Sequence, residues 1–176
     1  MKKVFQLVAI ACVALAFLTT SSAFAQGPTP VASPRDSVSA KVGGATISIN
    51  YGSPSVKGRK IFGGLEAYGK LWRAGANQAT VFTTDKDITV EGKKLAAGKY
   101  TFFAMPGEKE WKIVFNSQVG QWGINGQGAN ADPAKNVLEA TVTAKTAPAT
   151  ERLKYVINAT GFSLIWENTE VPVSIK

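Results

Sequence analysis

The chain contains no histidine and only one cysteine among its 176 residues. The absence of histidine removes the usual general base at neutral pH and the commonest ligand of transition metals. A single cysteine excludes an intramolecular disulfide and any zinc site built from several cysteines. These absences disfavour ordinary hydrolytic and metal-dependent chemistry. We therefore expect no catalytic residue, no metal ligand and no cofactor.

The length and composition fit one globular domain. Hydrophobic residues make up 45% of the chain, which is normal for a folded protein and argues against disorder. A chain of 176 residues has room for one domain but hardly for two. The formal net charge is +8, so the position of the basic residues is informative.

The N-terminal residues 1–25 have the layout of a secretory signal peptide. Lys2 and Lys3 precede an uncharged apolar run over residues 4–18, and the tripeptide AFA at 23–25 has small residues where cleavage occurs. An uncleaved membrane anchor is the alternative, but the run is shorter than the roughly 20 residues that span a bilayer. We expect export to the periplasm or the extracellular space, with no integral membrane segment in the mature chain.

After this segment the sequence has the pattern of strands. Residues 26–35 carry three prolines and resemble an extended leader. From residue 36 on, apolar and polar residues alternate, for example over 45–51, and Gly43-Gly44 is a hairpin signal between two such runs. Alternation predicts strands with one buried face. We expect one domain over 36–176, an antiparallel β-sandwich of nine or ten short strands, with a closed β-barrel as the alternative.

Residues 52–78 interrupt the alternation. This stretch of 27 residues contains six glycines and is far longer than an ordinary connection of about 4–6 residues. Ile61, Leu65, Tyr68 and Trp72 have near-helical spacing, which predicts one or two helical turns that cap an open end of the sandwich. Such a loop either carries function or plugs the end of the fold.

The same stretch holds much of the positive charge, with five basic residues against Glu66 alone. Basic groups among accessible amides suit phosphate, sulfate or carboxylate, whereas the simpler interpretation is a set of solvated loop charges. A nucleic acid is not expected as a partner, because the aromatic residues form no repeating platform. The predicted partner is a small anionic or glycan-like ligand. The predicted ligand-binding residues are Tyr51, Arg59, Lys60, Trp72, Arg73, Asn77 and Trp122.

The four tryptophans fall into two classes. Trp111 and Trp166 lie on apolar stripes and are expected in the core. Trp72 and Trp122 lie in the glycine-rich strings WRAGAN and GQWGINGQG, where a strand interior is not expected. Their indoles either stack on a sugar or another flat ligand, or pin a long loop to the domain.

An ordered series of strings carries a resemblance to a known family: INYGSPSVKGRKIFGG, YGKLWRAGANQAT, VEGKKLAAGKYTFFAMPGEKEWKIVFN, GQWG and WENTEVPVSIK. They resemble the domain-of-unknown-function 2911 family of exported bacterial proteins, common in Bacteroidetes-type genomes, over residues 33–176. The resemblance implies a single-domain extracytoplasmic protein and adds no reaction. Members of the family often have proline where this chain has Ala67 and glutamate where it has Gln78. If that glutamate is a catalytic acid, Gln78 does not replace it.

Three functional hypotheses remain open. The first and favoured one is a non-catalytic binding domain for an anionic or glycan-like ligand. The second is a structural or interaction protein of the cell envelope, in which the 52–78 loop is a plug or contacts an envelope protein partner. The third is a hydrolase-type enzyme that uses Arg or Lys with a carboxylate, for which Glu66 and Glu167 are the candidate acids; nothing in the sequence pairs them.

Overall fold

The computed structural model describes residues 32–126 and 128–176 of the chain, so the predicted signal peptide and most of the leader lie outside the described residues. Regular structure in the described part consists of strands and one short 3-10 helix. The strands are β1 (Arg35–Val42), β2 (Ala45–Gly52), β3 (Thr80–Thr84), β4 (Ile88–Val90), β5 (Lys93–Leu95), β6 (Gly98–Met105), β7 (Glu110–Asn116), β8 (Ile124–Asn125), β9 (Gly128–Ala129), β10 (Asn136–Thr143), β11 (Lys145–Asn158) and β12 (Gly161–Ser174); the 3-10 helix η1 is Pro133–Lys135.

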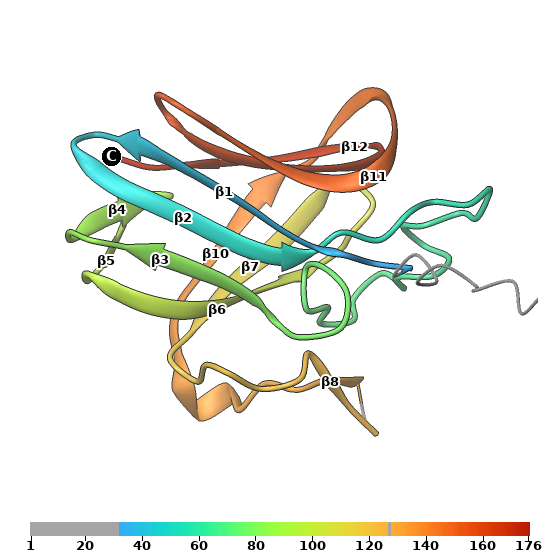
Figure 1. Ribbon diagram of the computed structural model, residues 1–176, viewed down its shortest axis with the longest axis horizontal. Helices are drawn as coiled ribbons and strands as arrows, with labels where there is room; N and C mark the ends of the chain where they lie inside the picture. The colour runs from blue at the N-terminus through green and yellow to red at the C-terminus, as the bar shows by residue number, and fades with distance from the viewer. Residues whose placement is uncertain (1–31, 127) are drawn as a thin grey trace, which may run out of the picture. The chain divides into compact units, whose positions relative to one another are not determined.

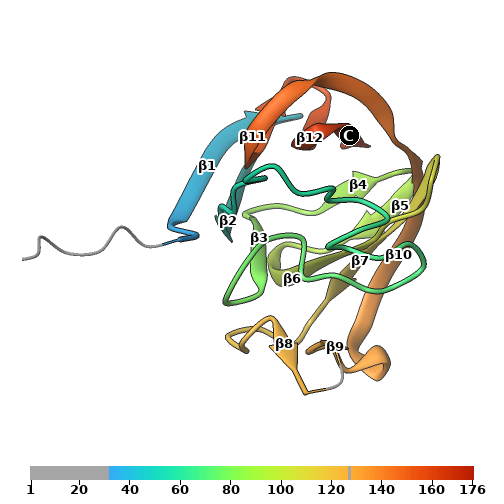
Figure 2. The ribbon, with the colours of Figure 1, turned by 90° about the vertical axis from the view of Figure 1, so that its right-hand side faces the viewer.

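Six of these strands form an antiparallel sheet in the order β1-β2-β3-β6-β7-β10 (Figure 1). The hairpin β11–β12 forms the second layer and lies across the sheet in both views (Figure 2). No sheet of the described residues closes into a barrel. The fold is therefore the predicted antiparallel β-sandwich, with two further short hairpins, β4–β5 and β8–β9.

The alternation in β2 shows how the sequence produces this arrangement. Ala45, Ile47, Ile49 and Tyr51 are buried, and the polar residues between them face outward or are only partly covered. The turn before β2 uses Gly43-Gly44, as predicted, with positive φ at both residues. Glycine has no Cβ penalty in this conformation, so the tight antiparallel pairing of β1 with β2 is favourable here.

Aromatic rings join the two layers. Tyr51 of β2 contacts Tyr155 of β11 at a centroid distance of 4.7 Å. Phe162 of β12 contacts Phe82 of β3 at 5.7 Å and Phe102 of β6 at 5.4 Å. These rings are fully buried and belong to one continuous core. Burial of each ring stabilises the sandwich by roughly 2–3 kcal/mol relative to its exposure.

The start of the domain lies slightly earlier than the sequence suggested. Strand β1 begins at Arg35, one residue before the predicted boundary. The carbonyl of Pro34 accepts a hydrogen bond from Ser53 N at 2.8 Å, and that of Ser33 accepts one from Asn77 Nδ2 at 3.2 Å. The last residues of the proline-containing leader are therefore fastened to the 52–78 loop.

Candidate functional site

The 52–78 loop follows a path fixed by the two layers. Ser55 pairs with Arg152 of β11, and Trp72 pairs with Ala104 of β6 through hydrogen bonds of 2.7 and 2.9 Å. Trp72 thereby continues the sheet next to β6, beyond the end of β3. The loop contains turns and bridges but no helix, so the predicted helical turns at residues 61–72 are wrong. Left-handed backbone at Gly63 and Gly69 explains this, because it interrupts a right-handed helix.

The middle of the loop belongs to the core. Trp72 is 3% exposed, stacks on Trp166 and donates its indole N–H to Gly75 O at 3.1 Å. Phe62 packs edge-on against Trp111 at 4.7 Å. Trp111 and Trp166 are in the core, as their apolar stripes predicted. Of the two interpretations of Trp72, its burial fits the one in which the indole pins the loop to the domain.

Tyr51, another predicted site residue, is also buried. Its hydroxyl donates to Asp36 Oδ2 at 3.0 Å and accepts a hydrogen bond from Tyr155 N at 3.3 Å. Burial, with the nearby Asp36 carboxylate, raises the pKa of Tyr51 to about 12. The ring therefore stays neutral and has a structural role beneath the loop.

Glu167 fastens the loop to the second layer. Its carboxylate accepts hydrogen bonds from Ile61 N at 3.1 Å and Phe62 N at 3.4 Å. The residue has φ +55, a conformation that costs about 1–2 kcal/mol for an L-residue other than glycine. Because this carboxylate is engaged with two backbone amides, the structure gives no support to a paired-acid mechanism with Glu66.

Arg73 and Glu66 lie close enough to influence each other electrostatically but do not form an ion pair. Both side chains are partly buried, and the buried Arg73 Nε has no hydrogen-bond partner among the described residues. No ion pair shorter than 4.0 Å joins Arg73 to a carboxylate in this part of the chain. Burial raises the pKa of Glu66 to about 7, although the charges of Arg73 and Arg59 oppose the rise. At neutral pH the carboxyl therefore only partly compensates the two guanidinium groups.

A second segment, residues 121–123, lies against Arg73. Gly123 N donates to Asn77 O at 3.0 Å, and Trp122 pairs with Gln78. A Cβ atom at Gly123 would clash with Arg73 Cδ, so glycine is required for this close approach. The structure thus places the backbone of the segment that carries Trp122 against Arg73 and Asn77, and Trp122 itself is 53% exposed.

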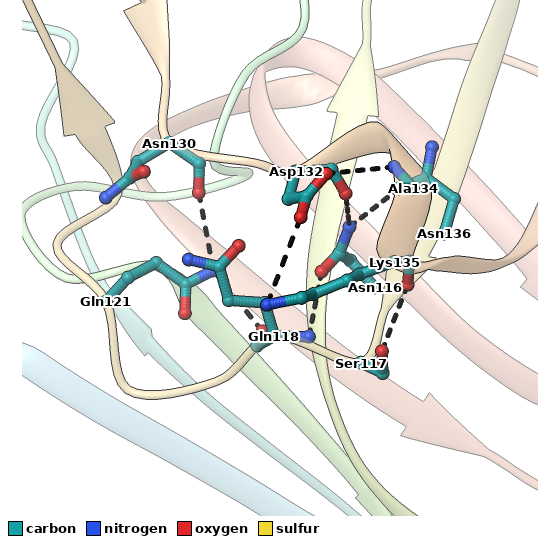
Figure 3. A network of polar contacts seen from close by, with 9 residues as sticks. All are labelled: Asn116, Ser117, Gln118, Gln121, Asn130, Asp132, Ala134, Lys135 and Asn136. Carbon is teal, nitrogen blue, oxygen red and sulfur yellow. Dashed lines mark hydrogen bonds and ion pairs between the residues drawn. The ribbon is translucent and has the colours of Figure 1, made fainter.

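The segment that carries Trp122 is anchored by a polar network at its base (Figure 3). Buried Asn116 donates to Asp132 O at 2.8 Å and to Asn136 Oδ1 at 2.7 Å, and its own oxygen accepts Gln118 N at 2.8 Å. Gln121 Nε2 reaches the carbonyls of Gln118 and Asn130. These bonds tie the two ends of the segment from Ser117 to Lys135 together, so the exposed indole is presented on a fixed support.

Arg59 and Lys60 lie earlier in the loop, and the charge of Arg59, like that of Arg73, acts on Glu66. Arg59 donates from Nη2 to Ser55 O at 2.7 Å and from Nε to Val56 O at 2.9 Å, whereas the side chain of Lys60 is exposed. Arg59 lines a pocket of about 370 Å³ between the loop and the β11–β12 hairpin. Its other polar lining residues are Thr150, Glu151, Glu167 and Asn168.

Sequence reasoning missed two members of these sites. Glu151, which lines the Arg59 pocket, comes from β11, about ninety residues after Arg59, and no local pattern connects the two. Gly123 stands in a glycine-rich string beside Trp122, and that string was the available signal for a close backbone approach. Among residues 32–126 and 128–176, no group of three or more acidic or cysteine side chains is placed to hold a metal ion.

Within the described residues, no helix has the length and apolar character needed to cross a bilayer.

The whole chain was compared with protein families, curated proteins and solved structures. No curated protein and no solved structure matches the chain. A family model described as "Protein of unknown function (DUF2911)" matches residues 33–175, most of the chain and nearly the whole described domain. The chain therefore belongs to the DUF2911 family.

Proposed function

We propose that this protein is an exported, non-catalytic binding domain that recognises an anionic, glycan-like ligand at Arg73 and Trp122. The observation that carries the proposal is that the positive charge of Arg73 has no ion-pair partner among the described residues. Its guanidinium is partly buried on an ordered loop, lacks an ion-pair partner in the described structure and has one buried nitrogen without a hydrogen bond. An incompletely neutralised guanidinium suits a carboxylate, sulfate or phosphate group, which it can bind with two parallel hydrogen bonds.

Trp122 supplies the complementary surface for the rest of the ligand. Its indole is 53% exposed and belongs to a segment held by the Asn116 network. A rigid exposed indole offers a flat apolar face on which a sugar ring can stack, at little cost in conformational entropy. Asn77 lies beside the same segment. Its backbone oxygen already accepts from Gly123 N and its Nδ2 donates to Ser33 O, which leaves its side-chain oxygen and second amide hydrogen for ligand hydroxyls.

Calorimetric titration with glucuronate, glucose 6-phosphate and neutral glucose tests this proposal. We expect the two anionic sugars to bind and glucose to bind at least about tenfold more weakly. Arg73→Ala should abolish the preference for the anion, and Trp122→Ala should weaken both sugars but leave inorganic phosphate unaffected. Lys41→Ala removes the same charge from an exposed position in β1 and serves as the control. Failure of every anionic sugar to bind, or equal binding by Arg73→Ala, would refute the proposal.

A second candidate function is supported by the apolar residues around the same loop. Leu65 is 47% exposed and Tyr68 is 41% exposed, and they flank Glu66 in the chain. Exposed aromatic residues such as Tyr68 are enriched at protein–protein interfaces. The alternative is therefore that the loop contacts a protein of the cell envelope.

Photo-crosslinking in intact cells distinguishes this alternative. A photoreactive residue at Leu65 should give a discrete crosslinked product if the loop docks on a protein, and the same residue at Lys41 should not. If only the uncrosslinked chain is recovered from both variants, the docking function is excluded and the small-ligand function stands alone.

A further inference from the structure

The pocket beside Arg59 is lined by neither Arg73 nor Trp122 and carries its own charges. Its volume is about 370 Å³, at the small end of the range for small-molecule sites. One wall is the loop at residues 56–59, and the other is formed by the β11–β12 hairpin at residues 149–151 and 167–168. The pocket brings one guanidinium and two carboxylates, from Arg59, Glu151 and Glu167, into one small space.

The positive charge in this pocket is fixed in position. Two of the three Arg59 nitrogens are hydrogen-bonded to the carbonyls of Ser55 and Val56. These carbonyls hold the guanidinium plane but do not neutralise its charge. No carboxylate lies within ion-pair distance of Arg59 in the described part of the chain. The charge of Glu66, which is incomplete at neutral pH because its pKa is raised to about 7, only partly offsets that of Arg59. Arg59 therefore keeps N–H donors and positive charge for a carboxylate from a ligand.

The two negative charges are also held by backbone groups. Glu151 Oε1 accepts Lys57 N at 3.0 Å, and the Glu167 carboxylate accepts the amides of Ile61 and Phe62. A carboxylate has about four acceptor positions, so both keep lone pairs for further donors. Neither forms an ion pair with a cation of the described residues.

This charge pattern selects the ligand. A simple anion would be repelled by two carboxylates, and a simple cation would leave Arg59 without a counter-charge. We infer that the Arg59 pocket binds a free basic α-amino acid, such as lysine or arginine. The ligand carboxylate pairs with Arg59, and its two cationic groups pair with Glu151 and Glu167. This inference goes beyond the proposed function, since it concerns another ligand and other residues.

The test titrates the protein with L-lysine and L-arginine, followed by calorimetry and by amide chemical shifts of residues 57–62 and 149–151. Two analogues each lack one group: norleucine has no side-chain cation, and cadaverine has no carboxylate. We expect each analogue to bind at least about tenfold more weakly than lysine. Equal binding of either analogue, or no binding of lysine and arginine in the millimolar range, would overturn the inference.

Matched variants locate the binding. Glu151→Gln keeps an oxygen for Lys57 N and removes only the charge, so it should fold normally and bind lysine about tenfold more weakly. Arg59→Gln should produce a similar loss. Glu108→Gln and Lys41→Gln change exposed charges elsewhere and should leave the affinity unchanged. If Glu151→Gln binds lysine as well as the unmodified protein does, the pocket is not the site.

Discussion

Trp72 and Trp166 stack on each other at one end of the core, with ring centroids 5.9 Å apart and planes inclined by 20°. Trp72 belongs to the long 52–78 loop and Trp166 to β12, so this contact joins the least regular segment to the second layer. Phe62 packs edge-on against both rings, at 6.0 and 5.9 Å. The loop therefore contributes to stability through its buried middle, while its surface remains available for binding.

The first prediction compares two tryptophans of the same chain. Trp72→Ala should lower the free energy of unfolding by about 3–5 kcal/mol, because it empties a buried, stacked position. Trp122→Ala should lower it by less than about 0.5 kcal/mol, because that indole is largely in solvent. Urea denaturation followed by circular dichroism measures both. Equal destabilisation would contradict the different roles assigned to the two side chains.

The second prediction concerns the tie between Glu167 and the loop. Glu167→Ala leaves the amides of Ile61 and Phe62 without their acceptor and should destabilise the protein by about 2 kcal/mol. Hydrogen exchange of these two amides should become faster, while exchange in β2 stays the same. Glu110→Ala, at an exposed glutamate of β7, is the control. Unchanged exchange at residues 61 and 62 would show that the carboxylate does not hold the loop.

Much of the fold follows from local sequence patterns. The alternation in β2 and the glycine pair at 43–44 specify a hairpin directly, because each requires only neighbouring residues to be read. The β4–β5 hairpin has the same kind of local signal, since Ile88 and Val90 precede the turn at Glu91-Gly92 and Leu95 follows it. In the 52–78 loop, the same reading of local spacing predicted helical turns that the structure does not contain. Ile61 and Trp72 do lie in the core, as their apolar spacing suggests. They reach it through a series of turns with positive φ at Gly63 and Gly69, not through a helix.

The candidate site was predictable in part. Charge in the 52–78 loop pointed to Arg73, and a glycine-rich string pointed to Trp122. The structure places Gly123, the next residue after Trp122, against Arg73. The sequence could not separate Arg59 from Arg73, since both are loop arginines. Only the structure shows that Arg59 lines a pocket with the β11–β12 hairpin, whereas Arg73 lies against Gly123. It also could not separate Trp72 from Trp122. Both lie beside glycines, and burial depends on pairing with Ala104 of a distant strand.

The third prediction is a pH dependence that originates at Glu66. Its pKa is raised from 4.5 to about 7 by burial, so the folded state holds this proton more tightly than the unfolded chain does. The stability contribution of the protonated carboxyl is fully present below pH 4.5 and is lost as the pH rises towards 7. Glu66→Gln cannot ionise, so it removes this pH-dependent loss of folding stability. The variant should therefore gain about 1–2 kcal/mol relative to the unmodified protein between pH 4.5 and 8, after allowance for solvent screening.

Urea denaturation at several pH values measures this difference. Glu108→Gln, at a fully exposed position, is the control and should show no such trend. A stability difference between Glu66→Gln and the unmodified protein that is constant across this range would show that Glu66 titrates as an ordinary surface carboxyl. The same series applied to glucuronate binding should show tighter binding at low pH, because neutral Glu66 no longer competes for Arg73.

The last prediction uses two glycines of the segment that carries Trp122. A Cβ at Gly123 would clash with Arg73 Cδ and lie 2.8 Å from the backbone oxygen of Asn77, whereas one at Gly126 would meet nothing within 4 Å. Gly123→Ala must therefore move either Arg73 or the backbone beside Trp122. Anionic sugar should then bind about tenfold more weakly, with a loss of stability of about 1–3 kcal/mol from overpacking.

Gly126→Ala should change neither quantity, because it adds the same methyl group to the same segment in open space. Parallel titrations of the two variants with glucuronate, together with their denaturation curves, give the comparison. Both variants add one methyl group to the same segment, so any difference between them must come from its position. A loss of affinity confined to Gly123→Ala locates binding where the segment touches Arg73. Equal affinity in both variants would mean that the contact between Gly123 and Arg73 is needed only for packing, and the ligand would then have to be sought away from Trp122.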